Sequence, residues 1–428
     1  MMPIQQEWLT YAPAPKPLGP DQRWHVFISY RSVDRSWVLK LYDALRQLGY
    51  EVFLDQYVLS AAAPLALTLG EALDSSAAAV MIWSNKYEDS QWCKSELNTL
   101  QVKEASGSGF RYVIAKVDSE PLPGLAAGKL YIDFSEQREG PSGRGLLSVI
   151  CGLAGQPLPP QAVVLAAKLD EEVRNALLLV RAAREAGDSQ TLIYLSKTQS
   201  SAWQGSPMLD CEVADALVAL KDCDAALSLL ESVIQAFPKA LRPQQLQGLA
   251  LARKGEWMQA QLVLGKLHAG GEIDPETLGI YARTWMDRYK ITNNRLFLLK
   301  SRELYRQAFE ASPSDYYTGI NAASKSLLLG ERETAKQLAS RVEGIVGTKP
   351  VPGEYWKTAT IAEVQLLQAH YSEAAAIYEA AIASAPLEAG SHESTFGQAK
   401  LLLGFLDAPS DARLQIEQVF ARATATGV

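Results

Sequence analysis

The sequence predicts two architectures in series: an α/β domain built on a doubly wound parallel sheet of five strands, and then an all-α solenoid of helix pairs. Before residue 155, five short runs of β-branched and aromatic residues alternate with helical patterns. After the proline-containing segment GQPLPP (155–160), strand patterns stop and alanine- and leucine-rich helices follow. We therefore expect, in order, an extended lead-in (1–22), the α/β domain (23–154), a linker (155–161) and the helical repeats (162–428).

Five nearly continuous apolar runs are the predicted strands. They are WHVFISY (24–30), EVFLD (51–55), AAAVMIWS (77–84), RYVIAKV (111–117) and KLYIDF (129–134). Such runs are typical of parallel strands that helices cover on both faces, joined by right-handed crossovers. Ligands bind beyond the carboxyl ends of the strands in such sheets. We therefore expect the chemistry in the segments that follow Tyr30, Asp55 and Ser84.

A helix is predicted between the first two strands. Ser32 or Asp34 can cap its amino end. Gly49 stands where a left-handed residue would end it. One face of the helix is apolar, formed by Val38, Leu41, Leu45 and Leu48.

Small residues recur in register in the C-terminal half. One unit contains Ala214, Leu217, Ala226, Leu230 and Pro238, the next Gly248, Leu251, Gly255, Ala260 and Leu264, and a later one Ala362, Ala369, Ala374, Tyr378, Ala381 and Pro386. Helices cross closely only where side chains are small. The pattern resembles the tetratricopeptide repeat of about 34 residues. A less regular unit spans 279–313, where we expect an insertion between the two helices.

Composition excludes several classes of protein. The 41 basic and 48 acidic side chains give a net charge of −7, without the basic excess of a nucleic-acid surface. No apolar run approaches the roughly 20 residues that span a bilayer, and prolines replace the apolar core of a signal peptide. The cysteines and histidines are dispersed, so we expect no metal site, and cysteines buried as small apolar residues. We expect a soluble, cytoplasmic protein with neither a nucleic-acid nor a membrane partner.

The segment SQWCKSELNTL (90–100) carries the strongest candidate for chemistry. It predicts a helix with Ser90 as its cap and Cys93, Leu97 and Leu100 on its inner face. Trp92 and Glu96 then lie one turn apart at the edge of that face. A carboxylate there suits a cationic reaction centre, although most glutamates on amphipathic helices are simply solvated.

Three motifs together resemble the TIR (Toll/interleukin-1 receptor) domain: HVFISYRSVD (25–34), YEVFLD (50–55) and WCKSEL (92–97). The resemblance implies a flavodoxin-like fold. More narrowly, the Phe-Ile-Ser-Tyr-Arg run and the tryptophan four residues before the glutamate resemble the NAD-cleaving TIR domains. That resemblance implies NAD as substrate, no cofactor or metal, and Glu96 as the catalytic residue. The residues that it implies for the nucleotide pocket are Tyr30, Arg31, Ser32, Asp55, Leu59 and Trp92.

Nicotinamide bound to ribose is already positively charged, so it needs no proton in order to leave. A single carboxylate that faces the oxocarbenium-like transition state is therefore sufficient. Hydrolysis, cyclisation and base exchange all begin with this cleavage, and the sequence leaves them open. A non-catalytic TIR adaptor is the main alternative, and the Trp92–Glu96 pair argues against it. One departure from the family is the alanine-rich loop SAAAP (60–64), in which Ala62 replaces a common glycine.

The segment 312–339 resembles the TRAF-binding, tetratricopeptide-like regulatory domain of stress-activated kinase kinase kinases. Its YYTGIN run (316–321) is interpreted as a packing corner between helices rather than a ligand site. The combined resemblance is to bacterial immune effectors. It implies self-association through TIR domains and an unidentified protein or ligand that the repeats bind.

Overall fold

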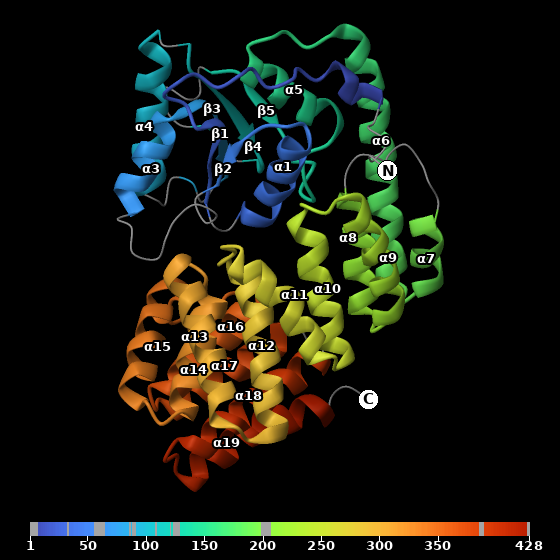
Figure 1. Cartoon of the computed structure of the whole chain (residues 1–428). Helices are drawn as coiled ribbons and strands as arrows, with labels where there is room; N and C mark the ends of the chain where they lie inside the picture. Colours follow the sequence, from blue (N-terminus) through green and yellow to red (C-terminus); the bar gives the residue numbers. More distant parts are fainter. Residues whose placement is uncertain are drawn as a thin grey trace. The chain divides into compact units, whose positions relative to one another are not determined.

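The computed structural model describes residues 7–31, 34–54, 65–84, 87, 91–107, 109–119, 121–122, 129–197, 207–384 and 389–425. The chain divides into two compact units, Met1–Glu272 and Ile273–Val428. The first unit holds the sheet together with the first helices of the repeat region, and the second is entirely helical (Figure 1).

The sheet has five parallel strands in the order β2-β1-β3-β4-β5. This is the doubly wound order, in which successive strands are added first on one side of β1 and then on the other, so the strand order reverses between β1 and β3. The predicted fold class is confirmed, and each strand lies within or one residue beyond its predicted run. The strands are β1 Trp24–Ser29, β2 Val52–Phe53, β3 Ser76–Trp83, β4 Arg111–Lys116 and β5 Tyr131–Asp133.

Helices cover both faces of this sheet (Figure 1). On one face α1 (Arg35–Gln47) and α5 (Gly143–Ala154) pack with Val26 and Ile28 of β1. On the other face α3 (Leu65–Asp74) and α4 (Gln91–Ala105) pack with Phe27. Successive residues of a strand point to opposite faces, so an unbroken apolar run supplies both cores.

The cap predicted for α1 is wrong in one respect. Asp34 occupies the N-cap position, but its carboxylate makes no capping hydrogen bond. It accepts a hydrogen bond from Ser84 Oγ at 2.6 Å instead, because the chain brings the end of β3 beside it. Ser32 lies outside the described residues. Gly49 has the predicted left-handed conformation, with φ of 88°.

The lead-in is tied to the amino-terminal edge of the sheet. It begins with a short 3₁₀ helix, η1 (Glu7–Tyr11). Tyr50 Oη then donates to the Pro13 carbonyl at 2.8 Å. His25 Nδ1 accepts from the Glu51 N–H at 2.8 Å, so Nε2 carries the hydrogen and donates to the Lys16 carbonyl at 2.9 Å.

The helices that follow the sheet begin directly against it. Asp170 of the first one accepts hydrogen bonds from the Arg144 N–H and from Ser142 Oγ, both at 3.0 Å, at the start of α5. Cys151, Cys211 and Cys223 are buried, as predicted. The helices are α6 Pro160–Glu185, α7 Ser189–Lys197, α8 Met208–Ala219, α9 Cys223–Ala236, α10 Leu241–Lys254 and α11 Trp257–Ala269.

Small residues allow the helices of a pair to approach, as the repeat pattern predicts. Ala214 and Ala226 are fully buried between neighbouring helices. A Cβ atom on Gly248 would lie only 2.7 Å from the Leu264 side chain, so α10 and α11 require glycine there.

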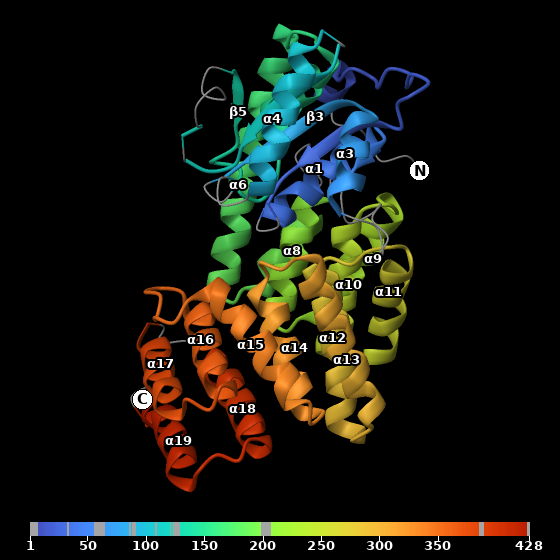
Figure 2. The same cartoon turned by 90° about the vertical axis from the view of Figure 1, so that its left-hand side faces the viewer.

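The second unit consists of helix pairs stacked side by side (Figure 2). The predicted insertion in the 279–313 unit is wrong, because the extra residues lengthen both helices and only Asn293 and Asn294 join them. The helices are α12 Pro275–Thr292, α13 Arg295–Ala311, α14 Tyr316–Leu328, α15 Arg332–Val346, α16 Tyr355–Leu367, α17 Tyr371–Ser384, α18 Ala389–Phe405 and α19 Ser410–Ala425.

The YYTGIN run begins α14 and packs closely. Asp315 caps the helix by accepting from the Thr318 N–H at 2.7 Å. A Cβ atom on Gly319 would come within 2.8 Å of both Val342 and Phe309. This geometry is that of a packing corner. Among the described residues, no helix is both long and apolar enough to traverse a bilayer.

Candidate active site

The centre of the candidate site is a hydrogen-bonded chain that ends on Glu96. Ser29, the last residue of β1, is 1% exposed and donates through Oγ to Glu96 Oε2 at 2.5 Å. The same Oγ lies 2.7 Å from Tyr87 Oη. A serine hydroxyl has one hydrogen, so the serine that donates to Glu96 accepts from Tyr87. The carboxylate of Glu96 is therefore oriented by the buried carboxyl end of β1.

Glu96 borders the buried face of α4, where the sequence predicts it. Leu100 of the same helix is fully buried and Leu97 packs against the same core, whereas Glu96 is half-buried. Trp92 lies one turn earlier in α4, and its side chain is outside the described part of the chain. A carboxylate at this border is partly shielded from water by the core beside it.

The carboxyl ends of β1 and β3 meet at the point where the strand order reverses. A second carboxyl lies there, since Asp34 accepts from Ser84 at the end of β3. Burial raises the pKa of Asp34 to about 6, against the lowering effects of the Ser84 hydrogen bond and the Arg31 charge. The nearby Asp118, which follows β4, raises this pKa further. This edge of the sheet therefore holds three acidic groups, Glu96, Asp34 and Asp118, and one cation, Arg31.

Tyr30 and Arg31 continue the chain directly from Ser29. Tyr30 Oη accepts a hydrogen bond from Arg35 Nη1 at 3.0 Å. The Nε atom of Arg31 is buried and has no hydrogen-bond partner among the described residues. Glu96, Tyr30 and Arg31 thus share one edge of the sheet. The other candidates, Ser32, Asp55 and Leu59, lie outside the described residues, as does the alanine-rich loop 60–64.

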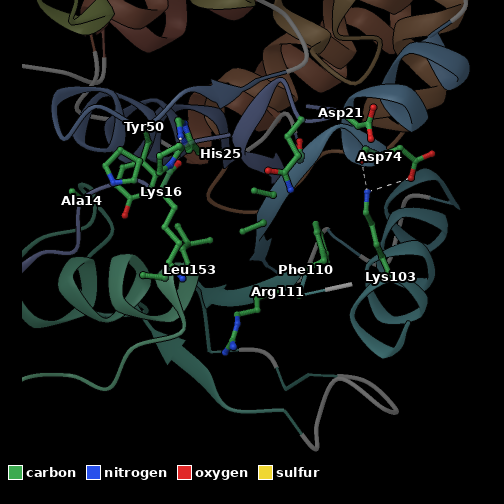
Figure 3. A pocket seen from close by; sticks show the side chains of 18 residues that line it. Ala14, Lys16, Asp21, His25, Tyr50, Asp74, Lys103, Phe110, Arg111 and Leu153 are labelled. Atoms are coloured by element: carbon green, nitrogen blue, oxygen red, sulfur yellow. Dashed lines mark hydrogen bonds and ion pairs between the residues drawn. The ribbon is translucent and has the colours of Figure 1, made fainter. Parts of the chain in front are cut away.

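A cavity of about 410 Å³ lies at the opposite, amino-terminal edge of the sheet (Figure 3). Its lining includes His25, Ser76 and Arg111, which stand at the starts of β1, β3 and β4. Lys103, also in the lining, is held by the Leu73 and Asp74 carbonyls at 2.7 and 2.8 Å. Four residues of extended strand, roughly 13 Å, separate His25 from Ser29. This cavity is therefore separate from the Glu96 site.

Two family models match the chain. The TIR domain model matches residues 26–147. Residues 26–147 form a TIR domain. The model described as Tetratricopeptide Repeats-Sensor matches residues 222–328, so a tetratricopeptide-like sensor region follows the TIR domain.

Among curated proteins, the TIR domain is similar to a probable 2′ cyclic ADP-D-ribose synthase, BdTIR, of Brachypodium distachyon. The identity is 38% over 84 residues, which are 19% of this chain. The match spans 38% of the length of that relative.

Among solved structures, the chain is similar to a thermophilic TPR protein of Thermus thermophilus, at 20% identity and a TM-score of 0.37. That match covers 45% of this chain and 97% of the other. MamA of Desulfovibrio magneticus gives 14% identity and a TM-score of 0.32, covering 40% and 94% of the two chains.

Three residues of the TIR domain lie in this site without having been singled out in the sequence: Ser29, Tyr87 and Arg35. Ser29 carries a usable signal, because a polar residue ends an otherwise apolar buried strand. Tyr87 and Arg35 carry none, since each is recognised only by the residue that it contacts across the fold.

Proposed function

We propose that the TIR domain cleaves the nicotinamide–ribose bond of NAD and that Glu96 is the catalytic carboxylate. The observation that carries this proposal is the hydrogen bond from buried Ser29 to Glu96 at the carboxyl edge of the sheet. The activity named for the Brachypodium relative supports it. Synthesis of a cyclic ADP-ribose from NAD also requires loss of nicotinamide.

The cleavage requires one oriented negative charge from the protein. When the bond between ribose C1′ and the pyridinium nitrogen breaks, its electron pair goes to the nitrogen and nicotinamide leaves neutral. The ribose then carries positive charge as an oxocarbenium ion, which a fixed carboxylate stabilises. The leaving group needs no acid. Glu96, with its direction set by Ser29, is suited to that task.

The remaining candidate residues are proposed to hold the rest of the substrate. The guanidinium of half-buried Arg31 suits the pyrophosphate, because its buried Nε has no hydrogen-bond partner among the described residues. Tyr30 and Trp92 offer aromatic faces, and we assign Ser32, Asp55 and Leu59 to the same pocket. NAD is the substrate, and the reaction requires neither cofactor nor metal.

The second step decides the product. If water bonds to C1′ and loses a proton, the product is ADP-ribose. If a hydroxyl group of the same molecule bonds to C1′ and loses its proton, the product is cyclic. We assign the enzyme as an NAD glycohydrolase, with cyclisation as the alternative second step. We further propose that self-association of TIR domains, or a partner bound to the repeats, controls the enzyme in antiviral or stress defence, because unrestrained cleavage would deplete the NAD of the cell.

The test is to incubate the purified full chain with NAD over a wide range of protein concentration and to separate the products by chromatography. Glu96→Gln keeps the shape of the side chain and removes its charge, so nicotinamide release should fall about 100-fold or more. Glu71→Gln, an exposed glutamate on α3, is the matched control and should retain full activity. A folded Glu96→Gln protein with normal turnover, or a wild-type protein that releases no nicotinamide at any concentration, would overturn the proposal.

A further inference from the structure

Arg35 connects the candidate site to the end of the first unit. It is the first residue of α1 and is 5% exposed. Its Nη1 donates to Tyr30 Oη at 3.0 Å, and its Nη2 donates to Glu272 Oε1 at 2.6 Å. The two nitrogens belong to one rigid, planar guanidinium group. A shift of either partner therefore turns the hydrogen bond to the other.

Tyr30 is the residue of this link that the proposed function assigns to the NAD pocket. It is bonded in sequence to Ser29, whose hydroxyl orients Glu96. The carboxylate and the phenol are therefore positioned from adjacent residues at the end of one strand. Ser29 holds the Glu96 carboxylate from inside the sheet, and Arg35 of α1 holds the Tyr30 hydroxyl.

Glu272 is the other side of the link, and its place in the chain is unusual. It is 2% exposed and is the last residue of the first unit, so its carbonyl carbon is bonded to the first residue of the second unit. Gly271, with φ of 99°, precedes it, and Asp274 caps α12 two residues later. Its backbone N–H donates to the Leu267 carbonyl at 3.0 Å, which anchors it to α11.

We propose that Arg35 is a positioning residue for Tyr30 and that Glu272, at the junction of the two units, sets the orientation of Arg35 and thereby the affinity of the site for NAD. This inference rests on the proposed function for its kinetic readout. A force on the second unit acts on the chain at residue 273 and so reaches Glu272 first. The buried ion pair then carries the displacement to Tyr30 through Arg35.

A second ion pair between α1 and the repeats provides a matched control. Lys40 Nζ lies 2.8 Å from Glu212 Oε1, on the same helix as Arg35 and against α8. It resembles the Arg35–Glu272 pair in charge and length, but no hydrogen bond of Lys40 reaches Tyr30 among those that the structure gives. The side chains of the Lys40–Glu212 pair are more exposed (15% and 31%, against 6% and 2%), so if the pairs only brace α1, each variant loses activity in parallel with stability and KM does not change alone.

The experiment compares Glu272→Gln with Glu212→Gln in the full chain. Each change keeps side-chain shape and removes one charge. Because hydrogen bonds to charged groups are among the strong ones, Glu272→Gln should raise KM for NAD about tenfold while kcat stays within about twofold. Glu212→Gln should leave both constants unchanged. Equal effects of the two variants would overturn the proposal.

A double-variant cycle tests whether Glu272 acts on NAD affinity through Tyr30. Tyr30→Phe removes the hydroxyl that Arg35 holds, so adding Glu272→Gln to Tyr30→Phe should change KM no further. An undiminished effect in that background would show that Glu272 acts by another route and would overturn the proposal.

Amide hydrogen exchange separates this inference from the proposed function. Peptides that contain Tyr30 should exchange faster in Glu272→Gln than in wild type or Glu212→Gln, whether or not NAD is cleaved. Faster exchange without any NAD cleavage would reject the proposed function and retain the link. Unchanged exchange would reject the link alone.

Discussion

Replacing Ser29 by alanine tests the geometry of the site more sharply than removing Glu96 itself. The carboxylate stays, but the hydroxyl that donates to it at 2.5 Å is lost. A hydrogen bond to a charged group contributes about 1.5–3 kcal/mol, so kcat/KM should fall roughly ten- to hundredfold if Ser29 orients Glu96 for the transition state.

The same substitution also affects stability, and the two effects can be separated. Tyr87 loses its 2.7 Å hydrogen bond to Ser29, so the free energy of unfolding should fall by about 1–3 kcal/mol. In the double variant Ser29→Ala/Tyr87→Phe the phenol hydroxyl is gone as well, and part of the stability should return. Activity should not return, because nothing replaces the donor to Glu96.

The assay is nicotinamide release under initial-rate conditions, beside urea unfolding of each variant. Ser76→Ala is the control: Ser76 is 2% exposed and donates to the Ala72 carbonyl at 2.7 Å, but it stands at the amino-terminal end of β3. Activity within about twofold of wild type for Ser29→Ala, or a double variant that regains activity with stability, would refute the reasoning.

Two further predictions concern pH and assembly. Burial raises the pKa of Asp43 from 3.8 to about 8, so between these values the folded protein holds a proton that the unfolded chain releases, and stability falls as pH rises. Asp43→Asn should flatten this part of the pH dependence in thermal melts and be the more stable protein above pH 8; parallel curves would contradict it. Specific activity of the full chain should rise steeply with protein concentration, and constant specific activity in a sample that light scattering shows to be monomeric would reject control by assembly.

Much of the fold was predictable because its signals are local. A strand covered on both faces must be apolar throughout, which is why the runs at 24–30 and 77–84 identify β1 and β3. The 3.6-residue period likewise places Glu96 beside a buried stripe that contains Leu100. Small residues in register predict closely crossed helices, and Gly248 against Leu264 is such a crossing.

The partners of the site residues were not predictable, because they are distant in sequence. Ser29 and Glu96 are 67 positions apart, and Arg35 and Glu272 are 237 apart. The cap expected from Asp34 fails for the same reason, since a local rule assigns its carboxylate to the helix while Ser84 at the end of another strand competes for it. The sequence also does not show whether the extra residues of the 279–313 unit form a loop or lengthen its helices. In the structure they lengthen α12 and α13.

The contacts of α1 argue against studying the TIR domain as an isolated fragment. One face of the helix is buried on the sheet, yet Arg35 and Lys40 form ion pairs with Glu272 and Glu212, and the Asp43 carboxyl accepts from the Leu241 N–H at the start of α10. Deleting residues 161–428 would remove all three partners at once. Breaking one buried ion pair by removing a partner costs about 3–5 kcal/mol, a large part of the stability of a small domain. An inactive fragment would therefore report loss of structure as readily as loss of control, and the single-charge variants at Glu272 and Glu212 are the experiments that distinguish the two.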